Sequence, residues 1–116
     1  MMNLTIKRFE IWLADLNPKQ GTEAGKTRPV VIVQTDLLNE FEHPSTIICP
    51  ITTNVQKGAD VLRVHLPKGN LDTESDIMVD QIRAIDNKRF IKKLGAINDN
   101  QRYQLVNSLK AILDLL

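Results

Sequence analysis

The chain has 116 residues and a formal net charge of +1 at neutral pH, with 42% hydrophobic and 25% charged residues. This composition is that of an ordinary soluble protein, and the length predicts one domain over residues 1–116. No apolar run approaches the ~18 residues that a membrane-spanning helix needs, and the start of the chain lacks the apolar core of a secretion signal. The near-neutral charge excludes a general attraction to nucleic acid, so any contact with phosphate must be local. The single cysteine, Cys49, excludes an internal disulfide, and we expect a cytoplasmic protein in which it is a buried small hydrophobe.

The first half of the chain predicts three strands joined by polar connections. Side chains that alternate between apolar and polar indicate a strand with one face in a core, whereas a continuous β-branched run indicates a central strand covered on both faces. In chain order, we expect a half-buried strand over 8–14, a loop over 16–27, a central strand over 29–35, an irregular connection or short helical turn over 37–45 and a strand over 46–52. Pro50 should lie near the end of its strand or at an edge, because proline cannot donate to a ladder.

The second half predicts further strands and then a helix. In order, we expect a loop over 53–59, a strand over 61–66, a turn over 67–74, one strand over 76–85, and a turn with a short strand over 87–97. Four aliphatic residues then recur at helical spacing, at positions 105, 109, 112 and 116. Asn98 and Gln101 resemble a capping box at the start of this helix. Five or six strands and one helix predict a mainly β protein, a small closed or nearly closed barrel with an amphipathic C-terminal helix.

The tripeptide Gly25-Lys26-Thr27 resembles the end of a phosphate-binding loop, but its context excludes that motif. The first glycine of the motif would have to be residue 20, which is Gln20. A helix must also follow directly, whereas Arg28-Pro29 and a strand follow here. Arg28 is left at the mouth of the central strand. Either its planar fork binds a pair of phosphate oxygens, or it is a surface arginine paired with an acid such as Glu23.

Three blocks of sequence, in order, resemble the MazF/PemK-type toxins of bacterial toxin–antitoxin systems. They are EIWLADLNPKQGTEAGKTRPVVIVQTD at 10–36, CPITT at 49–53 and DQIRAID at 80–86. Together with the terminal helix, the resemblance covers nearly the whole chain. It implies an SH3-like barrel of the PemK/CcdB-like type that forms a homodimer. It also implies cleavage of single-stranded RNA, mainly mRNA, without metal or cofactor, to leave 2′,3′-cyclic phosphate and 5′-hydroxyl ends. The implied partner is a MazE-like antitoxin whose extended segment covers the RNA groove.

The resemblance also implies catalytic residues. Arg28 matches the catalytic arginine of the Arg-Pro pair and suits the stabilisation of charge on phosphorus. Thr52 matches the threonine beside the scissile phosphate; Thr53 is adjacent, but neighbours on a strand face opposite ways, so we choose Thr52. Glu23 matches an acidic loop residue and is either the general base or a holder of Arg28. Thr22 stands where some relatives carry a histidine, which leaves the base open.

Further residues match the family's RNA-binding groove. The predicted RNA contacts are Thr22, Lys26, Thr53, Asp80 and Gln81. Amides and carboxylates such as those of Asp80 and Gln81 read base edges, although Asp80 could instead hold Arg83 or a turn. We expect Trp12 to pack in the scaffold and His65 to have a surface or structural role.

Two other functions remain open at this point. One is a gyrase poison with the same type of barrel and no catalysis. The other is an inactive relative that serves as a binding module.

Overall fold

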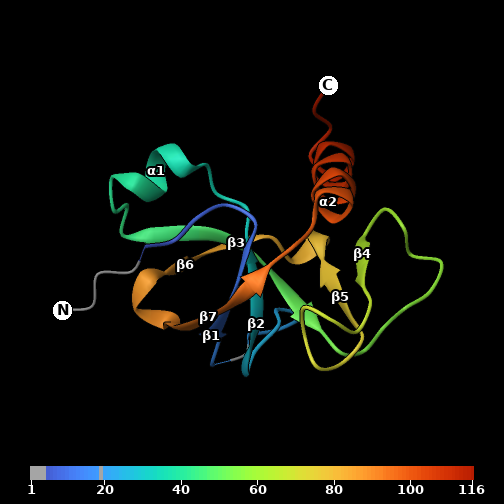
Figure 1. Cartoon of the computed structure of the whole chain (residues 1–116), viewed down its shortest axis with the longest axis horizontal. Helices are drawn as coiled ribbons and strands as arrows, with labels where there is room; N and C mark the ends of the chain where they lie inside the picture. Colours follow the sequence, from blue (N-terminus) through green and yellow to red (C-terminus); the bar gives the residue numbers. More distant parts are fainter. Residues whose placement is uncertain (1–4, 19) are drawn as a thin grey trace.

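The computed structural model describes residues 5–18 and 20–116, so the first four residues of the predicted domain and one residue of the predicted loop 16–27 lie outside it. The elements in chain order are β1 (Glu10–Asp15), β2 (Thr27–Ile32), α1 (Asp36–Glu40), β3 (Ser45–Thr52), β4 (Arg63–Leu66), β5 (Ser75–Met78), the 3₁₀ turn η1 (Val79–Gln81), β6 (Arg83–Asp86), the 3₁₀ turn η2 (Asn87–Arg89), β7 (Phe90–Ala96) and α2 (Asp99–Ile112). The strands form one antiparallel sheet in the order β4-β5-β3-β2-β1-β7, and β6 pairs with β3 (Figure 1). The sheet curls into a roughly barrel-like body, and its two end strands, β4 and β7, are not paired with each other in the described part of the chain. The mainly β prediction, in its nearly closed form, is confirmed.

The central strand β2 is covered on both faces, as its unbroken β-branched run predicts. Val30 and Ile32 pack into one hydrophobic cluster with residues of β1, β3, β6 and β7. Val31 and Val33 pack into the other cluster, which includes Leu105 of α2, and we call this cluster the helix-side core. Because each fully buried aliphatic side chain contributes about 1.5–3 kcal/mol, the two clusters hold β2 and β3 firmly in register.

Strand β3 changes partner along its length, and Pro50 lies where it does. Beside β2 on one edge, β3 pairs on its other edge with β6 over residues 45–48 and with β5 over residues 51 and 52. Pro50 falls between these two ladders, close to the end of the strand. A residue without an N–H is tolerated there because no ladder bond is needed on that edge.

The single strand predicted over 76–85 is wrong, because the structure divides it into β5, η1 and β6. The Val79 N–H donates to the carbonyl oxygen of Leu62, and the Ile82 N–H donates back to that of Val79. These bonds turn the chain between the two segments of β3 that β5 and β6 pair with. The strand count is therefore seven in the described chain rather than five or six.

The C-terminal helix α2 begins with the predicted capping box. The Asn98 side chain accepts from the Gln101 N–H at 2.8 Å, and the Gln101 side chain accepts from the Asn98 N–H at 2.9 Å. Leu105 is fully buried in the helix-side core, and Leu109 packs against that core. The helix ends at Ile112, so Leu116, which the sequence placed on the helical stripe, lies beyond it.

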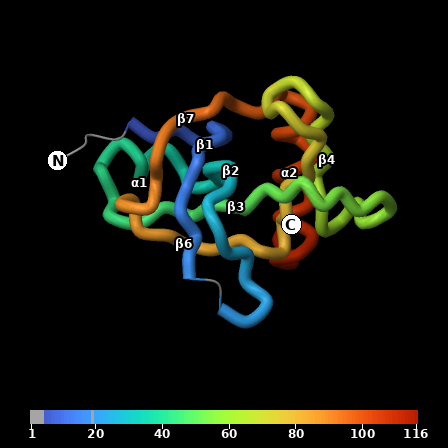
Figure 2. Tube along the Cα trace, turned by 90° about the horizontal axis from the view of Figure 1, so that it is seen from below, coloured from blue at the N-terminus to red at the C-terminus, as the bar shows by residue number. Residues whose placement is uncertain are grey.

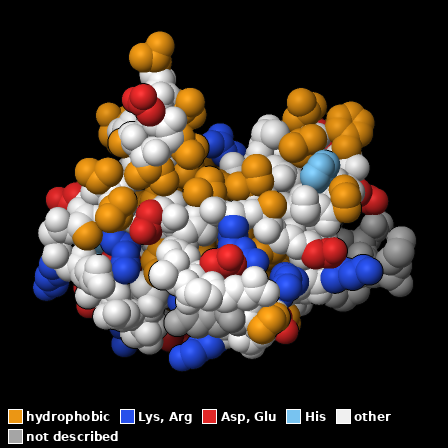
Figure 3. All heavy atoms as spheres, turned by 180° about the vertical axis from the view of Figure 1, so that it is seen from behind, with side chains coloured by type: hydrophobic (Ala, Val, Ile, Leu, Met, Phe, Trp, Pro, Cys, Tyr) orange, Lys and Arg blue, Asp and Glu red, His pale blue; other side chains and the backbone are white. Residues whose placement is uncertain are grey.

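The exposed apolar side chains include two groups on different parts of the described chain. One group is on the C-terminal end of the chain and consists of Leu113, Leu115 and Leu116, and the other is on and beside α1 and consists of Leu37, Leu38, Phe41 and Ile47. Figure 3 shows hydrophobic side chains gathered over the end of the chain that stands out from the body. The helical turn α1 confirms the expectation for residues 37–45. No helix among the described residues is long and apolar enough to cross a membrane.

Candidate active site

The start of β2, which carries Arg28, and the end of β3, which carries Thr52, lie at the same edge of the sheet. The two strands are antiparallel, with Val30 opposite Pro50. Continued by two residues, the same register sets Arg28 opposite Thr52. Directly opposed residues of an antiparallel pair project from the same face. The register therefore puts the two residues predicted at the scissile phosphate on the same face of the sheet, two positions beyond the last paired residues.

A pocket of about 230 Å³ opens at this edge, and we call it the Arg28 pocket. It is enclosed by the loop between β1 and β2, the start of β2, the end of β5 and η1. The residues that line it are Thr22, Glu23, Ala24, Gly25, Lys26, Arg28, Met78 and Gln81. The fold thus gathers five of the predicted site residues, from segments more than 50 positions apart, around one opening. Thr52, Thr53 and Asp80 do not line this pocket.

The Arg28 guanidinium is half-buried and is held by its own loop. Its Nε donates to the carbonyl oxygen of Gly25 at 2.8 Å. Burial lowers the pKa of Arg28 below its ordinary value of 12.5, although a guanidinium stays charged at neutral pH. Its two terminal amino groups make no hydrogen bond with the described residues, so the donating fork is available to a ligand. The proposed pairing of Arg28 with Glu23 is wrong.

Glu23 instead contacts Arg83, with 3.1 Å between Oε2 and Nη1. Close by, the Gln81 side-chain oxygen accepts from the Ala24 N–H at 3.3 Å. These two contacts tie the loop between β1 and β2 to η1 and β6. Arg83 was considered only as a partner of Asp80, and that pairing is wrong. Arg83 lies two residues after Gln81 in the DQIRAID block, and this position in the sequence could have indicated that it belongs to the same site.

Asp80 is exposed on η1, above the buried Cys49. Burial, with a smaller effect from the negative charge of Asp80, raises the pKa of the Cys49 thiol to about 12. The thiol is therefore neutral and shielded, which confirms the expectation of a buried small hydrophobe.

The two adjacent threonines lie in different surroundings. Thr52 is partly buried at the end of β3, and its hydroxyl oxygen accepts from the Asn54 N–H at 3.1 Å. Thr53 is exposed and lines a second pocket, which Pro29 and Leu94 also line. The alternation of strand residues therefore separates the threonines as expected.

The remaining predicted residues are accounted for by local contacts. Lys26 is exposed and has a positive φ of 67°, and its N–H donates to the Asn17 side chain at 2.8 Å. A strand, not a helix, follows it, as the exclusion of a phosphate-binding loop requires. Trp12 packs in the scaffold as expected: it is buried, donates to Glu10 at 3.1 Å and meets Phe90 edge-on. His65 lies on β4 between two carboxylates, those of Glu74 and Asp76.

Comparisons with known proteins agree with this architecture. Residues 7–113 match the family model described as PemK-like, MazF-like toxin of type II toxin-antitoxin system. The chain is 38% identical over 112 residues to Endoribonuclease MazF of Staphylococcus epidermidis, covering 95% of this chain and 92% of the relative.

Two solved structures share the fold at lower identity. The crystal structure of MazF from Deinococcus radiodurans superposes with a TM-score of 0.83 at 20% identity, over 97% of this chain and 100% of that one. An endoribonuclease in complex with its cognate antitoxin, from a mycobacterial species, superposes with a TM-score of 0.75 at 19% identity, over 99% and 98%. The family match, the close relative and the shared fold all cover nearly the whole chain, and the chain belongs to the PemK-like, MazF-like toxin family of type II toxin–antitoxin systems.

Proposed function

We propose that this protein is the toxin of a type II toxin–antitoxin system and acts as an endoribonuclease on single-stranded RNA, chiefly mRNA. Its relative of 38% identity is named as an endoribonuclease. The observation that carries the proposal is the half-buried Arg28, whose fork makes no hydrogen bond with the described residues at the mouth of a pocket, on the same edge of the sheet as Thr52. A gyrase-binding barrel or an inactive binding module has no need of this arrangement.

The reaction that suits these groups uses the ribose as its own nucleophile. The 2′-oxygen loses its proton and bonds to phosphorus, the bond from phosphorus to the 5′-oxygen breaks, and the leaving oxygen takes up a proton. The products are a 2′,3′-cyclic phosphate and a 5′-hydroxyl, and no metal is needed. Negative charge grows on the non-bridging oxygens in the transition state, where positioned donors have their largest effect.

Arg28 and Thr52 supply those donors. The terminal amino groups of Arg28 suit two phosphate oxygens at once, and their charge is permanent. The Thr52 hydroxyl keeps its own O–H to donate, because its contact with Asn54 uses only an acceptor lone pair. Arg28 and Thr52 are thus the proposed charge-stabilising pair.

Glu23 remains the proposed base or an anchor of its loop. Its side chain is half exposed and lies against Arg83, so a carboxylate oxygen stays open to solvent.

The surrounding polar side chains are the proposed RNA contacts. Thr22 and Lys26 line the Arg28 pocket with Gln81, whose amide N–H₂ is left free while its oxygen binds Ala24. Asp80, next to Gln81 on η1, and Thr53, which lines the second pocket, are exposed. Such groups suit unpaired bases and the phosphates between them.

We further propose a homodimer, a MazE-like antitoxin partner and a cytoplasmic location. The exposed leucines beyond α2 support an assembly, because a contiguous apolar patch of this kind is usual at protein–protein contacts (Figure 3). An extended antitoxin segment lying over the Arg28 pocket would occlude the RNA.

The proposal is tested by incubating the purified protein with a heterogeneous single-stranded RNA pool in EDTA and sequencing the cut ends. We expect 5′-hydroxyl and 2′,3′-cyclic phosphate ends at a defined sequence, and no cut where the 2′-hydroxyl is replaced by hydrogen. Ends with a 5′-phosphate would contradict the mechanism. Intact RNA together with trapped gyrase–DNA adducts would identify the gyrase poison, and intact RNA alone would favour the binding module.

A further inference from the structure

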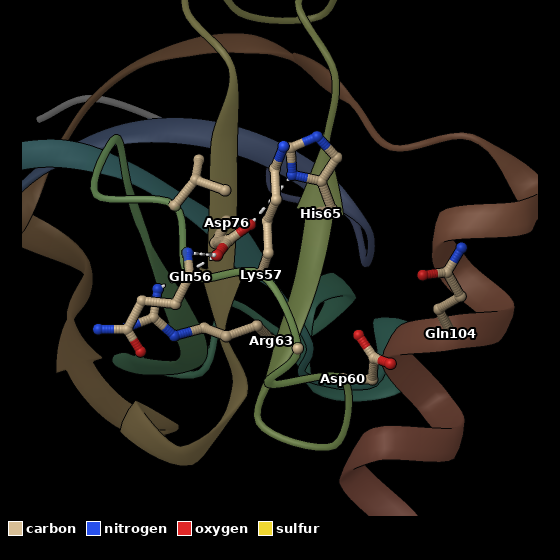
Figure 4. A pocket seen from close by; sticks show the side chains of 9 residues that line it. Gln56, Lys57, Asp60, Arg63, His65, Asp76 and Gln104 are labelled. Atoms are coloured by element: carbon tan, nitrogen blue, oxygen red, sulfur yellow. Dashed lines mark hydrogen bonds and ion pairs between the residues drawn. The ribbon is translucent and has the colours of Figure 1, made fainter.

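A buried carboxylate lies beside the site and takes no part in the proposed chemistry. Asp76 of β5 is 1% exposed and is surrounded by donors (Figure 4). Its Oδ2 accepts from the Gln56 N–H at 2.9 Å and from Arg63 Nη1 at 3.3 Å, while its Oδ1 lies 3.1 Å from His65 Nδ1. A carboxylate is retained in such a place only when its partners compensate for the loss of water.

Two of these partners lead into the loop between β3 and β4, residues 53–62, which projects from the body in Figure 2. Gln56 belongs to the loop itself. The same Nη1 of Arg63 that contacts Asp76 also donates to the carbonyl oxygen of Asn54 at 3.2 Å. Asp76 therefore holds the first part of the loop twice, directly at Gln56 and through Arg63 at Asn54.

Asn54 in turn contacts Thr52. Its N–H donates to the Thr52 hydroxyl oxygen at 3.1 Å, a local turn in which a threonine side chain binds the N–H two residues on. A hydroxyl has one donor and two acceptor lone pairs. With one lone pair occupied by Asn54, the O–H of Thr52 is confined to the directions that remain.

Asp76 and Thr52, the two ends of this chain of contacts, are also neighbours in the sheet. Asp76 is directly opposite Thr52 between β5 and β3, and opposite His65 between β5 and β4. His65, Asp76, Thr52 and, by continuation of the register, Arg28 thus form one cross-strand row. The contacts of Asn54 and Gln56 with Thr52 and Asp76 lie at the middle of that row.

We propose that Asp76, acting with Arg63, is a positioning residue for the Thr52 hydroxyl. It fixes Asn54 so that the Asn54 N–H occupies one side of the Thr52 oxygen and the O–H of Thr52 faces the scissile phosphate. This inference rests on the proposed RNA cleavage and deepens it, because it assigns a role to residues outside the Arg28 pocket. Asp76 itself does not touch the substrate.

A double-mutant cycle tests the inference by steady-state kinetics on an RNA oligonucleotide that the wild-type protein cuts. Asp76→Asn keeps the shape of the side chain and removes one carboxylate oxygen. We expect kcat to fall roughly 10- to 100-fold at unchanged KM, because misplacement of a catalytic donor by about 1 Å has effects of this size. In the Thr52→Val background the same change should have no further effect. A full, additive loss in that background would overturn the inference.

Two variants provide controls. Asp60 and Asp76 both line a pocket of about 260 Å³ (Figure 4). Asp60→Asn makes the same chemical change there, and the Asp60 carboxylate has no hydrogen bond or ion pair with the described residues. Its kcat should stay within about twofold of the wild type. Arg63→Lys keeps the positive charge but cannot reach Asp76 and Asn54 together, so it should reproduce the loss of kcat. Wild-type rates in Arg63→Lys would overturn the inference.

Amide hydrogen exchange separates this inference from the proposed function. In Asp76→Asn, the Asn54 and Gln56 amides should exchange at least tenfold faster while the amides of α2 keep their protection. Unchanged exchange at Asn54 would overturn the positioning role even if RNA is cut. Failure of the wild-type protein to cut RNA would reject the proposed function, and the exchange result would still decide whether Asp76 holds Asn54.

Discussion

Replacing Arg28 by alanine removes a charged fork that lines the Arg28 pocket, the proposed reaction centre. Loss of a single positioned donor to a developing oxyanion lowers kcat by about 10²–10³-fold, which is about 2.7–4 kcal/mol of transition-state stabilisation. Arg28 offers two free amino groups and a full charge, so we expect Arg28→Ala to lower kcat by at least about 10³-fold. Arg28→Lys keeps the charge but loses the fork and the Nε contact with Gly25. Its kcat should lie between those of the wild type and Arg28→Ala.

The protein should stay folded in Arg28→Ala. The structural loss is one hydrogen bond of 2.8 Å from a half-buried side chain, or about 1 kcal/mol of unfolding free energy. Arg102→Ala is a matched control: its Nε also donates to a backbone carbonyl oxygen, that of Ile97 at 3.2 Å. It lies over the ring of Phe9, at the opposite end of β2 from Arg28. We expect it to cost similar stability and leave kcat unchanged.

The assay is cleavage of a fluorescent single-stranded RNA in EDTA, with urea unfolding measured on the same preparations. Cleavage by Arg28→Ala within tenfold of the wild type would refute the assigned role. A fall in rate that merely follows a collapse of unfolding free energy would refute it too, since the loss would then be structural.

Three further predictions follow from the contacts around the site and the cores. If Glu23 is the base, Glu23→Gln should abolish cleavage while Arg83→Gln does not; equal losses in RNA cleavage assays would instead identify a loop anchor. For Glu10, burial raises the pKa, but hydrogen bonds, the largest from Lys93, lower it more, so its net pKa lies below the ordinary 4.5. The native state therefore binds fewer protons than the unfolded state, and stability should fall as the pH drops below about 4.5. Glu10→Gln should flatten that fall in urea unfolding, and an unchanged slope would contradict the assignment. Cys49, with its pKa raised to about 12, should react with a thiol reagent at pH 8 only as fast as the protein unfolds; rapid labelling without denaturant would disprove its burial.

Local patterns were enough to predict much of the fold. The β-branched run of β2 predicted burial on both faces, and the pair Asn98 and Gln101 predicted the start of α2, because both signals act within a few residues. The division of residues 76–85 could not be predicted in this way. Two short strands and one long strand carry the same alternation, and the turn at Val79 depends on a hydrogen bond to Leu62, which is distant in sequence.

At the site, too, the sequence identified individual residues but not the residues that they contact. The motifs singled out Arg28, Thr52 and Glu23, whose cross-strand or pocket positions follow from the fold. Their partners did not follow from the sequence. Ala24 and Gln81 are 57 residues apart, and contacts of that kind leave no periodicity to detect. Arg83 was therefore assigned to the wrong acid.

The strands that carry Arg28 and Thr52 contribute side chains to both hydrophobic cores, whereas three of the proposed RNA contacts, Thr22, Lys26 and Thr53, lie in loops. Under the proposed function, the catalytic residues and most of the RNA contacts therefore belong to different segments of the chain. Descendants of such a toxin could acquire new cutting sites by exchanging the loops at 16–26 and 53–62, provided that each new loop still offers Thr52 an N–H. Grafting these loops onto a distant homologue is, by the same reasoning, a route to ribonucleases with chosen targets.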